Sequence, residues 1–261
     1  MTSVRGGLQW GLDHMLAVGY GVLYDYIFER FPPYQRLQRE VLALVQAEAP
    51  ADRARVRVLD LGCGPGNFSL MLAEAGFSVI GVDAYDPLIA LAREKRRAQR
   101  LANLAFKHGD LVKDDPFPPE QFDQVINVHF LYAHPAPAAV LRAAYRVLKP
   151  GGHAFFVNLT RRVPVWATLR DVSRREGIVS ALTTLLWVLP NAIFETVRRQ
   201  TGPHYWDEAR MTEHLCEAGF ELVALRRTFF DGASLLASVR KPGTAAALPL
   251  AASSPTASGR F

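Results

Sequence analysis

The chain has 261 residues, of which 49% are hydrophobic and 21% charged, and it carries a formal net charge of +5. This is an ordinary globular composition, and the length suits one large domain or a core with an elaborated cap. The two cysteines, Cys63 and Cys216, are too few and too far apart for a disulfide framework or a zinc site. We therefore expect a reducing, cytoplasmic environment and no metal.

The N-terminal residues do not resemble a secretory signal, because Trp10, Asp13 and His14 interrupt any apolar core. The longest apolar stretch, residues 178–190, contains serine and threonine and is too short to span a bilayer. The densest basic run, residues 93–100, has no interleaved aromatic residues for base stacking. It indicates the solvated face and C-terminal end of a helix, so nucleic acid is disfavoured relative to a small molecule.

The predicted elements begin with a helical prelude over residues 8–46, divided by Pro32-Pro33. Short β-branched runs then alternate with helical patterns, which predicts parallel strands joined by crossover helices. The predicted strands cover 56–61, 78–83, 104–108, 122–129 and 153–159. The predicted helices cover 68–75, 87–101 and 137–148, and the turn Lys149-Pro150-Gly151-Gly152 ends the last of them.

This alternation stops after residue 159. Residues 160–206 are helical, aromatic and basic, with no strand pattern. A helix over 207–218 follows, and then strands over 220–229 and 233–240. Because Asp231-Gly232 suits a tight turn, we expect these two strands to form an antiparallel hairpin.

A glycine loop follows the first strand of the core. Gly62, Gly64 and Gly66 permit a sharp turn and the close approach of a ligand, and the next helix offers free N–H groups at its start. The dinucleotide fingerprint would need a third glycine where Asn67 stands, so an NAD enzyme is disfavoured. A plain tight turn is the alternative explanation of the loop alone.

Two carboxylates follow the next two strands. Asp83 lies about twenty residues beyond the glycine loop, where an acid can bridge both ribose hydroxyls. It could instead cap the next helix, although Asp86 is the better candidate for the N-cap because Pro87 follows it. Asp110 could accept a hydrogen bond from the amine of adenine. Both acids and the glycine loop are at carboxyl ends of successive strands, where doubly wound sheets bind ligands.

Five motifs, in this order and spacing, resemble the class I S-adenosylmethionine-dependent methyltransferases. They are residues 59–66 (LDLGCGPG), Val82-Asp83, Gly109-Asp110, Phe122-Asp123 and residues 146–152 (RVLKPGG). Residues 218–220 (AGF) match the small-molecule, quinone-type branch. The resemblance covers roughly residues 55–160 and 207–240. It implies S-adenosylmethionine as the cofactor, methyl transfer as the reaction, and a Rossmann-like, doubly wound α/β sheet, mostly parallel with an antiparallel C-terminal hairpin.

With this resemblance, the chain divides into five segments. They are a helical N-terminal lid (1–50), a cofactor-binding core (51–160), a helical cap insertion (161–206), a segment that completes the core sheet (207–241) and a disordered tail (242–261).

The resemblance also implies which residues bind the cofactor. The methionine end would contact the glycine loop and the acid before it, and the ribose would contact Asp83. The adenine would contact the residues after the second and third strands. The methyl group would lie beside the end of the fourth strand. The positions are Asp60, Gly62, Cys63, Gly64, Gly66, Asp83, Ala84, Asp110, Leu111, Asn127 and Val128.

His129 is the best candidate for a general base, because it stands at the end of the fourth strand. A structural, hydrogen-bonded histidine is the alternative, and His14 and His134 are weaker candidates. Many relatives have an acid followed by histidine where this chain has Tyr132 and Ala133. Residues 127–130 also lack the prolines of the motif with which related enzymes methylate nucleic-acid amines, which disfavours that substrate.

Aromatic residues in the prelude and the insertion predict a pocket for an apolar or amphipathic acceptor. Tyr24 and Tyr205 are the predicted substrate contacts, and the other candidates in the insertion are Trp166, Trp187, Phe194 and Trp206. Simple packing of the extra helices is the alternative.

Five arginines flank the apolar residues 178–189, a combination that suits an anionic membrane face. They are Arg161, Arg162, Arg170, Arg174 and Arg175.

The leading hypothesis is therefore transfer of a methyl group to an O, N or C atom of a small hydrophobic or amphipathic acceptor. A peripheral membrane methyltransferase acting on a lipid headgroup or a lipid quinone is the second hypothesis. A non-catalytic regulatory protein that binds the cofactor is the third. The oligomeric state stays open.

Overall fold

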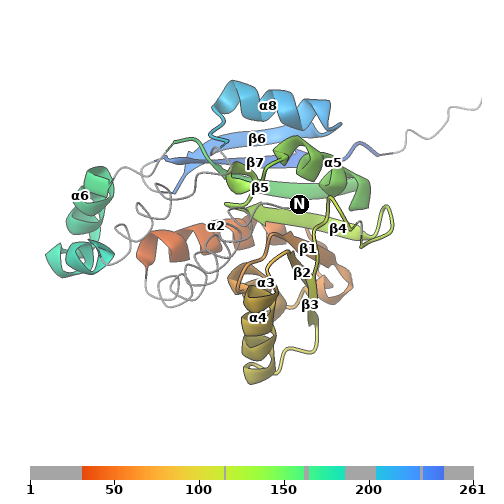
Figure 1. Ribbon diagram of the computed structural model, residues 1–261, viewed down its shortest axis with the longest axis horizontal. Coiled ribbons are helices and arrows are strands. Elements are labelled where there is room, and N and C mark those ends of the chain that lie inside the picture. The colour runs from red at the N-terminus through yellow and green to blue at the C-terminus, as the bar shows by residue number, and fades with distance from the viewer. Residues whose placement is uncertain (1–30, 115, 162–164, 186–203, 230–231, 244–261) are drawn as a thin grey trace, which may run out of the picture.

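The computed structural model describes residues 31–114, 116–161, 165–185, 204–229 and 232–243 (Figure 1). Tyr24, Arg162, Trp187, Phe194, most of the predicted lid and most of the predicted tail lie outside these ranges.

A single seven-stranded sheet organises the chain, in the order β3-β2-β1-β4-β5-β7-β6. Its strands are β1 (Arg57–Leu61), β2 (Ser78–Asp83), β3 (Leu104–His108), β4 (Phe122–Val128), β5 (Leu148–Leu159), β6 (Glu221–Thr228) and β7 (Ser234–Arg240). Strands β1 to β5 are parallel, whereas β7 runs antiparallel to both β5 and β6. The predicted doubly wound sheet with an antiparallel C-terminal hairpin is confirmed.

The described helices cover both faces of this sheet, apart from α6 (Val165–Glu176), which lies beyond α2 (Pro32–Ala47) and away from the strands (Figure 1). The others include α3 (Asn67–Glu74), α4 (Asp86–Ala98), α5 (Pro137–Val147) and α8 (Glu208–Glu217), with short 3₁₀ turns η1 (Arg53–Arg55) and η2 (Leu131–Ala133). The apolar sides of α2, α3 and α4 belong to one core cluster. Those of α5 and α8 belong to the other. The parallel strands are therefore buried on both faces, as their continuous apolar runs require.

Helix α2 is a layer of the core. Leu37, Val41 and Val45 recur at helical spacing and are fully buried, and Tyr34 packs edge-on against Phe68 of α3, with ring centroids 5.3 Å apart. The described part of the prelude thus supports the sheet. The predicted N-terminal lid (1–50) includes this helix, whose apolar side is part of the core, and the first thirty residues of that lid lie outside the described ranges.

The predicted turn over residues 149–152 was wrong. Strand β5 already begins at Leu148, which pairs with Phe122, and the register shifts before His153 pairs with Gln124. A Cβ on Gly152 would lie 2.8 Å from the carbonyl oxygen of Asp123. The glycine therefore lets the chain stay beside β4 through the irregularity, so pairing between strands outweighs the local turn signal.

The predicted N-cap of α4 was also wrong. The helix includes Asp86 in its first turn, and the capping position belongs to Tyr85. The amide of Tyr85 donates to Asp83 Oδ1 at 2.9 Å. Asp86 retains a favourable place near the positive end of the helix dipole.

Candidate functional site

The glycine loop joins β1 to α3 and crosses the end of β2. The amides of Gly62 and Cys63 donate to the carbonyl oxygen of Val82, at 2.9 and 3.0 Å. The ring of Phe130 lies 2.4 Å from where a Cβ on Gly62 would stand, so only glycine fits there. Gly64 has a φ of +52°, and apart from its chain neighbours no atom of the described residues lies within 4 Å of its ideal Cβ position. Space is therefore open for a ligand against the backbone of Gly64.

Asp83 is fixed by the loop and by the start of α4. Its Oδ2 accepts the amide of Gly64 at 2.9 Å, and its Oδ1 accepts that of Tyr85 at 2.9 Å. Each carboxylate oxygen keeps a further lone pair for a ligand hydroxyl. Burial raises the pKa of Asp83, and the backbone donors oppose this rise. The site thus holds an oriented acceptor that water solvates poorly.

Asp60, on β1, is a second buried acid behind the loop. It accepts a hydrogen bond from the hydroxyl of Ser69 on α3 at 2.6 Å. The pKa of Asp60 is raised to about 7, mainly by burial and also by the charge of Asp83, against the lowering effect of the hydrogen bond from Ser69. Two neighbouring acids whose ionised forms are disfavoured match a cationic ligand, because its charge would stabilise both.

The turn after β3 contains the other predicted adenine contacts. Asp110 Oδ1 accepts the amide of Val112 at 2.9 Å, and its Oδ2 lies 3.4 Å from the ammonium nitrogen of Lys113. Leu111 is buried, and the carbonyl oxygen of Ala84 lies 3.0 Å from Nε2 of His108. This turn is joined to β2 by the amide of Gly109, which donates to the carbonyl oxygen of Asp83 at 3.0 Å.

Lys95 on α4 holds the glycine loop through hydrogen bonds. The sequence did not lead us to this residue. Its ammonium group donates to the carbonyl oxygen of Pro65 at 3.0 Å and to the side-chain oxygen of Asn67. Arg93 and Arg96 in the same basic run donate to carbonyl oxygens of β3. The prediction that this run is only a solvated face was therefore wrong for these residues. Lys95 follows the apolar residue Ala92 by three positions, which is helical spacing, and this was the signal in the sequence.

The end of β4 brings polar groups to the same edge of the sheet. Asn127 is buried, and its amide nitrogen donates to the carbonyl oxygen of Leu61 at 2.6 Å, which ties β4 to the start of the loop. Val128 is half-buried against the α2 and α3 side of the core. Phe130, two residues on, packs against Gly62.

His129 adopts a left-handed backbone conformation, with φ of 54°. Its Nε2 lies 2.9 Å from the hydroxyl oxygen of Ser234 on β7, and its ring packs on Phe229 with centroids 4.8 Å apart. Burial lowers the pKa of His129 to about 3. The ring is therefore neutral at ordinary pH, and Ser234 fixes its orientation.

Tyr205 lies beside the segment that follows β4. Its ring stacks on that of Tyr132 in η2, with centroids 6.3 Å apart, and the amide of His204 donates to the carbonyl oxygen of Tyr132 at 2.7 Å. Of the other predicted aromatic contacts, Trp206 is buried in the core and Trp166 is exposed. Trp206 therefore packs in the core, as the alternative explanation of these aromatic residues expected.

The methyltransferase-domain profile matches residues 34–225, which include the glycine loop, both buried acids and the end of β4. The chain belongs to the methyltransferase-domain family. This confirms the family resemblance found in the sequence, and it implies S-adenosylmethionine as the cofactor.

Relatives and solved structures agree with this family. The chain is 35% identical over 136 residues to the ubiquinone biosynthesis O-methyltransferase of Idiomarina loihiensis, covering 51% of each protein. It is 34% identical over 105 residues to the enzyme of that name from Pseudomonas fluorescens, covering 40% of this chain and 45% of the relative. The chain thus spans about half the length of the curated relatives that it matches.

A solved S-adenosylmethionine-dependent methyltransferase from Aquifex aeolicus superposes with a TM-score of 0.53 at 16% identity, covering 82% of this chain and 92% of that one. At this identity, the superposition confirms the fold.

The site of this family member fits S-adenosylmethionine in both shape and charge. Among the described residues Gly64 leaves its surroundings open, Asp83 presents an oriented carboxylate, and Asp60 adds a second buried acid whose ionised form a cation would stabilise. The described residues contain no cluster of three or more His, Cys, Asp or Glu side chains that could hold a metal ion. Within the same residues, no helix is long and apolar enough to cross a bilayer.

Proposed function

We propose that the protein transfers a methyl group from S-adenosylmethionine to a small apolar or amphipathic acceptor held beside the end of β4. One observation carries the proposal: the open glycine loop, the buried acids Asp60 and Asp83, and the tethered end of β4 lie at a single sheet edge. The names of the curated relatives support a quinone-like acceptor.

The protein's residues would align the reactants. Asp83 would accept the ribose hydroxyls, and Asp110 with Leu111 would flank the adenine. Asp60 would face the cationic methionine end, where Gly64 allows close approach. S-adenosylmethionine supplies a methyl group on a sulfonium, which is already a good leaving group. Alignment of this kind can contribute ~7–11 kcal/mol, so acid–base chemistry is a smaller part of the rate.

The low pKa of the buried His129 ring favours an acceptor whose hydroxyl is acidic. A neutral imidazole whose pKa is about 3 is a weak proton acceptor. A phenolic hydroxyl, with a pKa of ~10, loses its proton far more readily than an aliphatic alcohol does. We therefore propose a phenol-type hydroxyl as the methylated group, with the neutral ring of His129 orienting that hydroxyl.

The test compares matched acceptors, a phenol with an apolar tail and the alcohol with its ring saturated, by release of S-adenosylhomocysteine. We expect turnover of the phenol and little of the alcohol, and a loss of roughly 10²-fold or more in kcat for His129→Gln. A variant within tenfold of the wild-type kcat would remove His129 from the chemistry. Cofactor binding without turnover of a broad acceptor panel would instead favour the regulatory alternative.

A further inference from the structure

Exposed apolar side chains are concentrated on the helical insertion. Trp166 is 82% exposed, and Ile178, Val179 and Leu182 are 68%, 71% and 59% exposed. In the part of the chain that the structure describes, Val223 on β6 is the one other large hydrophobic side chain with such exposure, at 56%. Water thus contacts several large apolar side chains of the insertion, outside the core.

Residues 178–185 form a helix that follows α6. At 3.6 residues per turn, Ile178, Val179 and Leu182 fall on one side, and Ala181 and Thr184, which are buried, fall on the other. Apart from Thr183, which is also exposed, the outward side of this helix is therefore apolar, where an ordinary surface helix would be polar.

Helix α6, the preceding helix of the insertion, has exposed cations of its own. Trp166, Arg170 and Arg174 are exposed and spaced four residues apart, so they share one stripe of the helix. Neither arginine forms an ion pair with any residue in the described ranges. Interfacial helices combine an aromatic ring with arginines in this way, because the ring enters the boundary region and the cations meet lipid phosphates.

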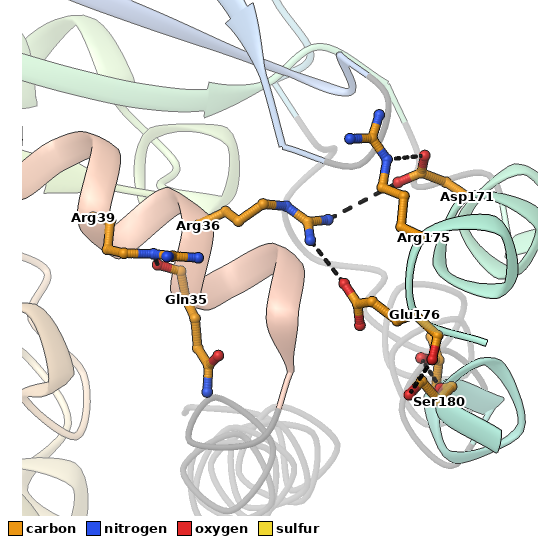
Figure 2. Close-up of polar contacts among 8 residues, drawn as sticks. Gln35, Arg36, Arg39, Asp171, Arg175, Glu176 and Ser180 are labelled. Atoms are coloured by element: carbon orange, nitrogen blue, oxygen red, sulfur yellow. Dashed lines mark hydrogen bonds and ion pairs between the residues drawn. The ribbon is translucent and has the colours of Figure 1, made fainter.

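The two acids in the described part of the insertion, Asp171 and Glu176, form ion pairs with Arg36 of α2 and with Arg175 (Figure 2). Arg36 of α2 reaches Oε1 of Glu176 at 2.7 Å and Oδ2 of Asp171 at 4.0 Å. Arg175 pairs with Asp171 at 2.7 Å. The outward stripe therefore keeps its positive charge, and Figure 1 places α6 at the end of the molecule beyond α2, away from the sheet.

We propose that this surface, the outer face of the insertion, docks on an anionic lipid bilayer. It consists of Trp166, Arg170, Arg174, Ile178, Val179 and Leu182. Its apolar side chains would enter the headgroup boundary, and its arginines would pair with anionic headgroups. Charge complementarity selects this occupant, because an apolar surface with cations and no acid is the counterpart of such a membrane. This docking is independent of the acceptor and of turnover.

The test is co-sedimentation of the full chain with vesicles of phosphatidylcholine alone or of phosphatidylcholine with one quarter phosphatidylglycerol. The wild type should pellet with the anionic vesicles and be released by salt. Because each basic residue strengthens such attraction about fivefold, Arg170→Gln with Arg174→Gln should weaken partitioning about 30-fold. Ile178→Gln with Leu182→Gln should weaken it about tenfold or more.

Matched control variants remove the same kinds of side chain, two arginines or an apolar residue, from surfaces outside the insertion. Arg97→Gln with Arg100→Gln deletes two exposed charges on and just after α4, and Val223→Gln deletes an exposed apolar residue on β6; both should pellet like the wild type. Circular dichroism should show native folding in every variant. Equal pelleting with both vesicle types, or unchanged pelleting of the insertion variants, would overturn the proposal. An oligomer that these variants dissociate without lipid would also overturn it, since the face would then join copies of the chain.

Discussion

Asp83 has both of its carboxylate oxygens held by backbone amides, so its position is set before any ligand arrives. Asp83→Asn should lower the affinity for S-adenosylmethionine about 10- to 100-fold, since charge-assisted hydrogen bonds contribute ~1.5–3 kcal/mol. Calorimetry on the folded variant measures this loss. Asp86→Asn, three residues along and exposed, should bind like the wild type. Unchanged affinity in Asp83→Asn would remove this carboxylate from the cofactor site.

Asp60 makes stability depend on pH. Folding raises its pKa from 3.8 to about 7, so the native protein holds a proton there that the unfolded chain releases. The contribution of Asp60 to stability is therefore complete below about pH 4 and is lost as the pH rises to about 7. Asp60→Asn keeps an oxygen for Ser69 and removes the ionisation.

The free energy of unfolding of Asp60→Asn, relative to wild type, should therefore increase between pH 4 and pH 8, by at most roughly 4 kcal/mol. Urea denaturation across this range measures the difference, and Asp86→Asn should show no such trend. A difference that stays constant with pH would mean that Asp60 is not perturbed by burial.

At the scale of elements, α4 holds the glycine loop through Lys95. Lys95→Met keeps the apolar stem and removes the donor to the Pro65 carbonyl. A hydrogen bond from a charged group contributes ~1.5–3 kcal/mol, and part of this loss should appear as a less ordered glycine loop. We therefore expect S-adenosylmethionine to bind roughly tenfold more weakly to the variant. Arg97→Met, at an exposed position of the same helix, is the control for loss of one cation. Equal affinities of both variants would assign Lys95 to helix packing alone.

The insertion and α2 are coupled by Arg36. Arg36→Gln breaks the contacts with Glu176 and Asp171, whereas Arg39→Gln removes a cation of the same helix that contacts only its own turn at Gln35 (Figure 2). We expect faster amide hydrogen exchange over residues 165–185 in Arg36→Gln and not in Arg39→Gln. Identical exchange in both variants would show that the apolar contacts of the insertion suffice to hold it.

At the scale of the whole molecule, the core described here starts at Phe31, and α2 already packs on the sheet. Deletion of residues 1–30 should therefore leave a cooperatively folding protein, while turnover is lost if those residues cover the acceptor. Deletion of residues 244–261 is the control and should leave turnover intact. Thermal unfolding and product release measure the two properties. Full activity without residues 1–30 would refute a covering role.

The sheet could be predicted from sequence because most strands contain a short apolar run and most crossovers have a helical pattern. The glycine loop and the acids that follow β2 and β3 could be predicted because parallel strands bring their carboxyl ends together. The support by Lys95 could not, since its partner Pro65 lies thirty positions earlier. Nor could the neutral state of His129, because its burial depends on Phe229 and Ser234, which are about a hundred residues away.

Strand β7 occupies an interior place in the sheet although it comes last among the strands. During synthesis, β5 must therefore wait for residues 234–240 before its free edge is covered. An unpaired apolar strand edge is a template for association with other chains. The interval between the emergence of β5 and that of β7 is thus the period in which a nascent chain most needs a chaperone, and a ribosome that stalls before Ser234 releases an aggregation-prone product.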